Sequence, residues 1–339
     1  MKAFITLALG ALLAWHPNAY ALACGDTLSS DTTLTADLHC TTGWNALYMP
    51  VGGVTLRLNG HTISGGIGLE GVSVFTASNV RILGPGRITG FWTGVNATRA
   101  DYLTVQGVDF DNTSAGIIAS DTLGTFLQGN DFRNINGWGV YIFAYPGASR
   151  SVLGAHTIAD NLVLESVGGI FICGHANSDN LLKNNTLQGI RDYGIHLLDG
   201  SGKNQVRGNQ LLKIENTGLV LRGSRDNTIK SNKFEYGYAG IAMIPQFTGG
   251  CPTGPYASAD VRDNLIEGNS IFKQTTGIAA GLGGKGGALV QKNRIGYNKL
   301  YYDGTGIYFN TDTYANDATL NAYTGTTTPV DDHGVSNTW

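Results

Sequence analysis

The sequence predicts a β-solenoid, in which short parallel strands stack turn upon turn. The first observation behind this prediction is a recurring asparagine that is closely followed by the apolar residues of a strand. The steps between successive copies are 31, 24, 24, 23, 37 and 24 residues. A repeat in the low twenties with several short strands per unit is typical of a stacked solenoid. The copies, which we expect to stack at one turn of the fold, are Asn130, Asn161, Asn185, Asn209, Asn232, Asn269 and Asn293.

The second observation is a glycine that follows most of these asparagines by eight or nine residues and opens an apolar strand. Gly194-Ile195-His196-Leu197-Leu198 aligns with Gly218-Leu219-Val220-Leu221-Arg222 and with Gly240-Ile241-Ala242-Met243-Ile244. Apolar and variable positions alternate in each copy, which is the pattern of a strand with one buried side. Because every turn repeats the direction of the turn before it, we predict parallel strands.

The repeat divides the chain into four parts. It runs without a linker over residues 51–310, which predicts one domain of about ten turns. Residues 24–50 are expected to cap the open N-terminal end, because an exposed sheet edge needs a cover. Residues 311–339 lose the apolar period and are expected to form a flap or a tail. Residues 1–23 have the basic start and apolar run of a secretory signal peptide, which predicts a secreted or periplasmic protein.

The composition narrows the possible partners. Glycine accounts for 49 of the 339 residues, about twice the usual share, and it lacks a collagen period, so we assign it to tight turns. The net charge of −3 argues against nonspecific nucleic-acid binding, which needs a basic surface. After the leader, no segment of the sequence is long and apolar enough to span a membrane. We expect a monomer.

Export permits disulfide bonds, and the sequence has four cysteines. Cys24 and Cys40 are expected to join within the N-terminal cap. The rival interpretation is a lipidated Cys24, although Ala21 stands where a lipobox usually has leucine. Cys251 lies in the repeat of 37 residues, so we expect an inserted loop from Pro245 to Asp260 that overhangs the outer face and reaches Cys173.

The segment Val54-Thr55-Leu56-Arg57-Leu58-Asn59-Gly60-His61-Thr62-Ile63, with the asparagine-containing turns, resembles secreted right-handed parallel β-helix proteins of the pectate-lyase-like superfamily. The resemblance covers about residues 24–310 and implies an all-β, right-handed parallel β-helix. That superfamily includes polysaccharide lyases, glycoside hydrolases, uronate epimerases, phage tailspikes and adhesins. The Asp-Pro-His-Asp motif of alginate C5-epimerases and the ordered motifs of polygalacturonases are absent, so no catalytic residue is assigned by motif.

Functional residues are expected on the outside, because stacked aliphatic side chains fill the inside of such a fold. Alignment on the glycine predicts two outward columns. The first contains Tyr141, Phe171, His196, Val220, Ala242, Ala279 and Tyr308, and the second contains Phe143, Cys173, Leu198, Arg222, Ile244, Gly281 and Asn310. Tyr145, His175 and Asp199 lie just beyond the strands. Aromatic rings beside a few titratable groups suit a sugar-polymer groove, because the rings stack on sugars and the polar groups orient them.

These residues favour an enzyme that degrades an acidic polysaccharide by β-elimination. That reaction needs a base for the C5 proton, a group that neutralises the carboxylate and an acid for the leaving oxygen. We assign His196 or His175 as the base, Arg222 as the carboxylate clamp and Tyr141 as the acid. The substrate-binding residues are predicted to be Tyr145, Phe171, Tyr308 and Asp199.

Two other functions stay open. The same groove would serve a noncatalytic polysaccharide-binding or adhesin-like protein. A glycoside hydrolase would need two carboxyl groups ~5–10 Å apart, and Asp192, Asp199, Glu215 and Asp226 are candidates. We expect no cofactor and no zinc site, although calcium could bind at Asp109-Phe110-Asp111-Asn112 or at Asp199-Gly200-Ser201-Gly202.

Overall fold

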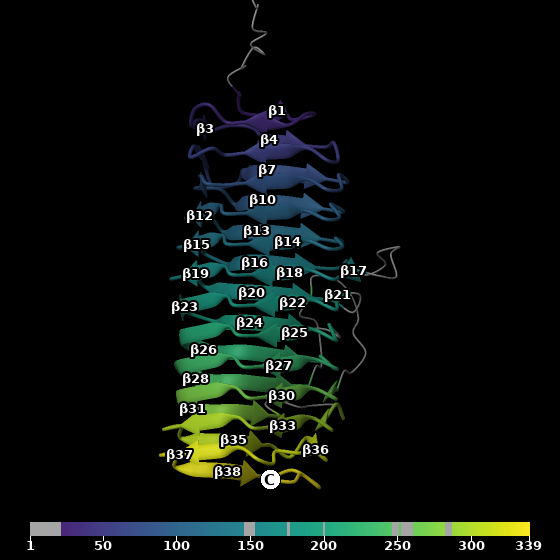
Figure 1. Cartoon of the computed structure of the whole chain (residues 1–339), viewed down its shortest axis with the longest axis vertical. Helices are drawn as coiled ribbons and strands as arrows, with labels where there is room; N and C mark the ends of the chain where they lie inside the picture. Colours follow the sequence, from purple (N-terminus) through teal and green to yellow (C-terminus); the bar gives the residue numbers. More distant parts are fainter. Residues whose placement is uncertain are drawn as a thin grey trace, which may run out of the picture.

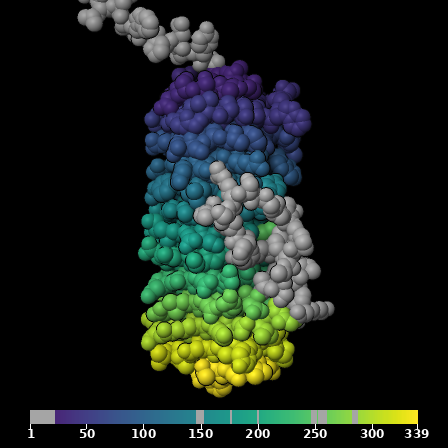
Figure 2. Space-filling model, turned by 90° about the vertical axis from the view of Figure 1, so that its right-hand side faces the viewer, coloured from purple at the N-terminus to yellow at the C-terminus, as the bar shows by residue number. Residues whose placement is uncertain are grey.

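The chain forms a right-handed parallel β-solenoid of about 12 turns in the computed structural model (Figure 1). The structure describes residues 22–145, 153–174, 177–198, 201–245, 251, 260–281 and 287–339. All strand pairs within this part are parallel, and each strand pairs with its counterpart one turn away. Figure 2 shows the result from the side, where the colours of successive turns follow one another from the N-terminal to the C-terminal end.

Each turn has three faces. The long face carries the outward columns and consists of β1 (Asp26–Thr27), β4 (Asn45–Met49), β7 (Glu70–Phe75), β10 (Thr93–Thr98), β13 (Ala115–Ser120), β16 (Trp138–Phe143), β20 (Gly168–Cys173), β24 (Tyr193–Leu198), β26 (Gln210–Arg222), β28 (Lys233–Ile244), β31 (Ser270–Ala280), β35 (Thr305–Phe309) and β38 (Thr328–Asp332). The strands β26, β28 and β31 are long because each also supplies the preceding face of its turn.

That preceding face, called the second face, otherwise consists of β3 (Leu38–Cys40), β6 (Thr62–Gly65), β9 (Arg87–Thr89), β12 (Asp109–Asp111), β15 (Asp131–Arg133), β19 (Leu162–Leu164), β23 (Thr186–Ile190), β34 (Lys299–Tyr301) and β37 (Ala322–Thr324). The third face is an 11-stranded sheet of β2 (Thr32–Thr33), β5 (Thr55–Arg57), β8 (Arg81–Leu83), β11 (Thr104–Gln106), β14 (Phe126–Gln128), β18 (Thr157–Ala159), β22 (Leu181–Lys183), β25 (Gln205–Arg207), β27 (Thr228–Lys230), β30 (Leu265–Glu267) and β33 (Arg294–Gly296).

Short strands pair at the corner between the long face and the third face. They are β17 (Leu153–Gly154) with β21 (Asn177–Ser178), and β29 (Val261–Arg262) with β32 (Val290–Gln291) and β36 (Thr313–Tyr314). The predicted signal peptide lies outside the described residues, apart from Leu22 and Ala23. In the described part of the chain, no helix has the length and apolar character that crossing a membrane requires.

Two asparagine ladders hold the turns together. In the first ladder, the side-chain oxygen of Asn209 accepts hydrogen bonds from the backbone N–H and the side-chain amide of Asn185, both at 2.9 Å, and Asn209 donates in turn to Asn232. A second ladder stacks Asn180 on Asn204 in the same way. The two ladders lie at the two ends of the third-face strand, so buried backbone groups at both corners are satisfied.

One residue of the predicted ladder belongs elsewhere. Asn293 stacks on Asn264 in the second ladder, whereas Asn269 continues the first ladder to Asn298. The prediction was wrong here because both ladders place an asparagine before an apolar strand residue, and the two asparagines of a turn are only five residues apart. The 29-residue steps from Asn264 and Asn269 preserve this pairing.

The interior is apolar on all three sides. Leu182, Leu187, Ile195 and Leu197 come from the three faces of adjacent turns and are fully buried. The glycine that opens each long-face strand lies where the next turn comes closest. A Cβ atom on Gly194 would lie 2.5 Å from the carbonyl oxygen of Gly218 and 2.6 Å from Cδ2 of Leu211. Only glycine fits such an approach without moving the backbone.

The solenoid is longer than the ten turns predicted. Residues 24–50 supply β1 to β4, which pair in parallel with the next turn, so this end segment is itself part of the stack. The segment 311–339, for which we expected a flap or a tail, supplies β36, β37 and β38 and continues the sheets. Its polar sequence hides the repeat, but Asn316, Asn321 and Asn337 extend both ladders.

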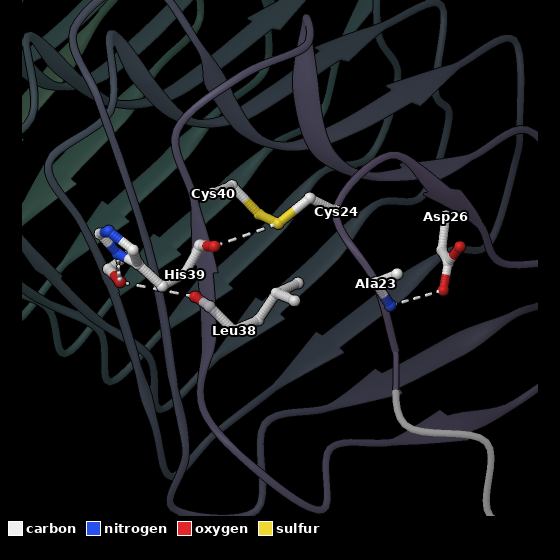
Figure 3. Close-up of a disulfide and its surroundings, with 7 residues drawn as sticks. Ala23, Cys24, Asp26, Leu38, His39 and Cys40 are labelled. Carbon is white, nitrogen blue, oxygen red and sulfur yellow. Dashed lines mark hydrogen bonds between the residues drawn. A yellow bond between two sulfur atoms is a disulfide. The ribbon is translucent and has the colours of Figure 1, made fainter.

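Both predicted disulfides are present. Cys24 joins Cys40 at the N-terminal end, where the bond ties the start of the first turn to β3 (Figure 3). The sulfur of Cys24 is therefore engaged, in contrast to the lipidated alternative. Cys173 joins Cys251 with a Cα–Cα distance of 5.8 Å. The rest of the predicted loop lies outside the described residues, apart from Pro245 and Asp260.

Candidate functional site

The outward columns lie in the predicted register. Tyr141 pairs with Phe171, Phe171 with His196, and His196 with Val220 on consecutive long-face strands. In the second column Cys173 pairs with Leu198, and Leu198 with Arg222. The two columns could be predicted because successive side chains of a strand point to opposite faces, so residues two apart share a face.

An aromatic wall surrounds His196. Its ring centroid lies 4.9 Å from those of Phe171 and Tyr193, in edge-on contacts, and 6.2 Å from that of Trp138. Trp138 also stacks on Phe171 at 4.8 Å, and Tyr141 lies 5.0 Å from Phe171. The wall therefore spans three consecutive turns, β16, β20 and β24.

His196 itself is an unsatisfied polar group. Only 4% of the residue is exposed, yet neither Nδ1 nor Nε2 has a hydrogen-bond partner among the described residues. Burial lowers the pKa of His196 to about 3, and the positive charge of Arg222 acts in the same direction. The imidazole is thus neutral at physiological pH, with a lone pair available on one ring nitrogen.

Arg222 lies on the next turn and is half-buried, and its Nε has no partner among the described residues. Its charge reaches Asp192 as well as His196. Partial burial raises the pKa of Asp192, although a hydrogen bond from Asn216 at 3.3 Å and the charge of Arg222 oppose that rise. We call Asp192, Tyr193, His196 and Arg222 the His196 site.

Two residues of this site were not predicted to act with His196. Tyr193 was given no role from the sequence, and Asp192 was considered only as a hydrolase carboxylate. The structure places the ring of Tyr193 beside His196, whereas Tyr141 lies two turns away, with Phe171 between. Two turns correspond to ~10 Å along the stack. A usable signal existed in the sequence, because Tyr193 immediately precedes Gly194, the glycine on which the turns were aligned.

A second apolar cluster covers the outward face next to this site. It consists of Phe143, Phe171, Cys173, Leu198 and Cys251, with Ile118, Trp138 and Tyr141 packed against it. Tyr145 extends the cluster to its exposed edge, where its ring meets Phe143 at 5.0 Å. The disulfide to Cys173 therefore fixes Cys251 over the second column.

Other predicted residues do not join the His196 site. Tyr308 lies four turns away from His196, through Val220, Ala242 and Ala279, and contacts His333. His175 and Asp199 lie outside the described residues. Glu215 lines a separate cavity with Arg191, and Asp226 is exposed beside Arg225. Among the described residues, no group of three His, Cys, Asp or Glu side chains could hold a metal ion.

The comparisons with known proteins agree with this architecture. A family model for the right-handed β-helix region matches residues 51–211. The described residues have the right-handed parallel β-helix fold, which extends beyond the matched region in both directions. No curated protein matches the sequence of this chain.

Solved structures of other β-helix proteins resemble it in fold. The A-modules of the Azotobacter vinelandii mannuronan C-5 epimerases AlgE4 and AlgE6 superpose with TM-scores of 0.72 and 0.66 at 14% and 13% identity. The alignments cover 91% of this chain and 91% of the AlgE4 module, and 94% and 92% for AlgE6. A tailspike protein variant of the E. coli bacteriophage HK620, in complex with a pentasaccharide, has a TM-score of 0.55 at 11% identity, over 89% of this chain and 72% of the tailspike.

Proposed function

We propose that this β-helix protein is an exported enzyme that degrades an acidic, uronate-containing polysaccharide by β-elimination at the His196 site. The observation that carries the proposal is the pair of unsatisfied groups, His196 and Nε of Arg222, behind an aromatic wall. A buried polar group without a partner costs ~1–3 kcal/mol, so its presence indicates a ligand that supplies the missing partner. The apolar leader and the two disulfides support export.

Arg222 is the residue that binds the uronate carboxylate. Its half-buried guanidinium offers donors that the described residues leave unused. A carboxylate accepts two parallel hydrogen bonds from such a group. Neutralisation of the carboxylate stabilises the negative charge that develops when the adjacent C5 proton is removed.

His196 is the base. Its neutral imidazole takes the C5 proton, the C5–H electron pair forms the C4=C5 double bond, and the C4–O bond to the next sugar breaks. Burial is the main cause of the low pKa of the free histidine, and the positive charge of Arg222 lowers that pKa further. A bound carboxylate offsets that charge and so raises the pKa of His196. The base is therefore stronger when a uronate is bound than when a neutral sugar is bound.

Tyr193 is the better-placed acid. Its ring lies 4.9 Å from that of His196, so one sugar unit can meet both side chains. The phenol gives its proton to the leaving oxygen, and the proton held by His196 returns to Tyr193 to restore the starting state. This assignment replaces Tyr141, which lies two turns from the base.

The fold neighbours lend support of a general kind. Two of them are named as mannuronan C-5 epimerases, and epimerisation at C5 begins with removal of the same proton. The tailspike neighbour holds a pentasaccharide. Of the candidate hydrolase carboxylates in the described part of the chain, Asp192 lies at the His196 site, Glu215 lines a neighbouring cavity with Arg191, and Asp226 is exposed beside Arg225.

The test is incubation of the protein with polymannuronate, alginate, polygalacturonate and glycosaminoglycans in heavy water, with dextran as the neutral control. We expect new ultraviolet absorbance from unsaturated uronates with one acidic polymer and none with dextran. Deuterium at C5 without that absorbance would mean epimerisation instead. New reducing ends without absorbance would mean hydrolysis, and binding alone would mean an adhesin-like module.

A further inference from the structure

A second feature lies outside the His196 site, at the corner between the second face and the long face. Each turn has one residue there in the left-handed backbone region. Early turns use Asn112 and Asn134, which tolerate this conformation, but later turns carry Glu165, Gly189, Lys213, Tyr236, Lys273 and Tyr302, with φ between 47° and 68°. The left-handed conformation does not favour tyrosine or lysine, so the backbone alone does not explain why these residue types occur at the corner.

The corner is hollow in its middle turns. A cavity of about 450 Å³ is lined by Glu165, Gly189, Arg191, Lys213, Glu215 and Tyr236. Gly189 opens the space, because a Cβ atom at this position would lie 2.6 Å from Oε1 of Glu165. The cavity borders the His196 site, since Arg191 and Asp192 are consecutive in the chain.

Aromatic rings continue from the cavity toward the C-terminal end. Tyr236 meets Phe272 edge-on at 5.7 Å, and Phe272 meets Tyr302 in the same way at 5.7 Å. Nζ of Lys273 lies 5.4 Å from the ring of Tyr236 and 5.1 Å from that of Phe272. Tyr236 and Tyr302 are 45% and 57% exposed, so their rings remain available to a ligand.

The charged side chains that line the cavity form no salt bridge with any described residue. None of the salt bridges within the described residues involves Arg191, Lys213, Glu165 or Glu215, whereas the nearby Lys233 pairs with Glu235 at 2.8 Å. Cations of this kind bind carboxylates, and carboxylates accept hydrogen bonds from sugar hydroxyls. Rings that stack on sugar faces complete the set that an acidic glycan requires.

We propose that Arg191, Lys213, Tyr236, Phe272, Lys273 and Tyr302, the corner strip, bind an acidic polysaccharide chain at a second site. The strip follows the edge of the stack at β23, β26, β28 and β31 (Figure 1). Successive turns are ~4.8 Å apart, which is close to the length of one sugar unit, so the chain lies along the solenoid axis with about one unit per turn. The class of ligand rests on the proposed function, whereas the location does not.

The test measures binding of polymannuronate, polygalacturonate and dextran in the His196→Ala background, which removes turnover. Tyr236→Ala and Lys273→Ala should each weaken polyuronate binding ~3- to 10-fold, the scale of one exposed aromatic or cationic contact. Tyr297→Ala and Lys292→Ala are the matched controls, because both residues are exposed and left-handed, with φ of 56° and 55°, but lie at other corners. Melting temperatures check that the four variants are folded.

If the strip variants and the control variants bind polyuronate equally well, the proposed binding site at the corner strip is wrong, even if the His196 site is active. The same holds if no polyuronate binds or if dextran binds as well as the polyuronates do. Weaker binding by Tyr236→Ala and Lys273→Ala alone supports the strip, even if the wild-type protein shows no turnover and the proposed function fails.

Discussion

His156 and His196 are both buried histidines with a lowered pKa, about 4 and about 3 respectively, and burial is the main cause in each case. Their surroundings differ. Nδ1 of His156 accepts the backbone N–H of Thr125 at 3.1 Å, so Nε2 donates to Asn177 at 2.9 Å. His196 has aromatic neighbours and no hydrogen-bond partner among the described residues.

This difference distinguishes His156, which has a structural role, from His196, which is a candidate functional residue. His156 also donates its backbone N–H to Asn180, so it takes the place of an asparagine at the head of the second ladder. Every polar atom of its ring is used to hold turns together. His196 leaves its polar atoms unused at the outer face, where stability would favour an apolar residue. This contrast is the reason why we propose His196, and not His156, as a functional residue.

The largest effect expected is on turnover. His196→Ala or Arg222→Ala should reduce turnover ~100- to 1,000-fold, the usual scale for loss of a base or a charge-stabilising group. Initial rates on the acidic polymer identified by the panel measure this. His156→Asn, which keeps a ladder donor and acceptor, serves as the control and should leave the rate unchanged. If both site variants stay folded and lose less than about threefold, the active face lies elsewhere.

The acid assignment gives a somewhat smaller effect. Tyr193→Phe should lower kcat ~100-fold with little change in KM, because the ring remains and only the proton donor is lost. Tyr141→Phe should change kcat less than about threefold, since its ring lies beyond Phe171. Steady-state kinetics of the two variants decide between them, and the opposite ranking would restore Tyr141 as the acid.

The ranking of the two histidines should be reversed for stability, because His156 is hydrogen-bonded and His196 is not bonded to any described residue. His156→Ala removes the acceptor of the Thr125 N–H and the donor to Oδ1 of Asn177, so we expect a loss of ~2–4 kcal/mol in the free energy of unfolding. His196→Ala should cost less than ~1 kcal/mol, because it removes an unsatisfied group. Urea titrations at pH 7 measure both values. Comparable losses in the two variants would contradict a structural role that is specific to His156.

The pH dependence follows from the same lowered pKa values. An unfolded histidine binds a proton below about 6.5, whereas His156 in the folded state stays neutral down to about pH 4. The unfolded state therefore takes up more protons, and stability falls as the pH drops from 6.5 toward 4. His156→Asn should flatten this acid slope in urea titrations at several pH values. An unchanged slope would mean that other groups cause it.

Asp303 provides a third buried case with a smaller effect. Its Oδ1 accepts the N–H of Gln274 at 2.8 Å, while its Oδ2 has no partner in the described part of the chain. Burial raises the pKa of Asp303 from 3.8 to about 7. The folded state holds this proton more tightly, so stability falls as the pH rises from about 4 to about 7.

Asp303→Asn should remove that fall and stabilise the protein by ~2 kcal/mol at pH 8. At pH 4 the variant should differ little from the wild type, because the carboxyl group is then protonated in the folded state. Thermal melts at the two pH values provide the comparison. Equal effects at pH 4 and pH 8 would contradict the raised pKa.

Much of this fold can be predicted from residue spacing. The glycine alignment placed Phe171, His196 and Arg222 in the correct columns, because the glycine fixes the register of each strand and the strand period of two fixes which residues share a face. The assignment of Asn293 failed because two ladders five residues apart share one local pattern. The ladder asparagines of the C-terminal turn, Asn316 and Asn321, carry the same spacing, but Ala318 and Tyr323 follow them where the preceding turn has Ile295 and Leu300.

The candidate site was predicted only in part. Asp192 lies in the bend that precedes β24, and Tyr193 is the first residue of that strand, so the alternation of the strand does not predict where their side chains lie. Their proximity to His196 and Arg222 depends on that bend and on the aromatic packing of Trp138 and Phe171. Sequence periodicity carries no information about either.

The paired ladders also bear on how such a chain can change over evolutionary time. Asn180 and Asn185, Asn204 and Asn209, and Asn264 and Asn269 keep a constant gap of five residues. The path from Asn209 to Asn227 takes 18 residues, however, whereas the path from Asn232 to Asn264 takes 32. Between the long face and the third face, new sequence can therefore enter without disturbing the stacked amides. A lineage could exchange peptides at that corner, or a protein engineer could graft them there, and so alter molecular recognition on an unchanged frame.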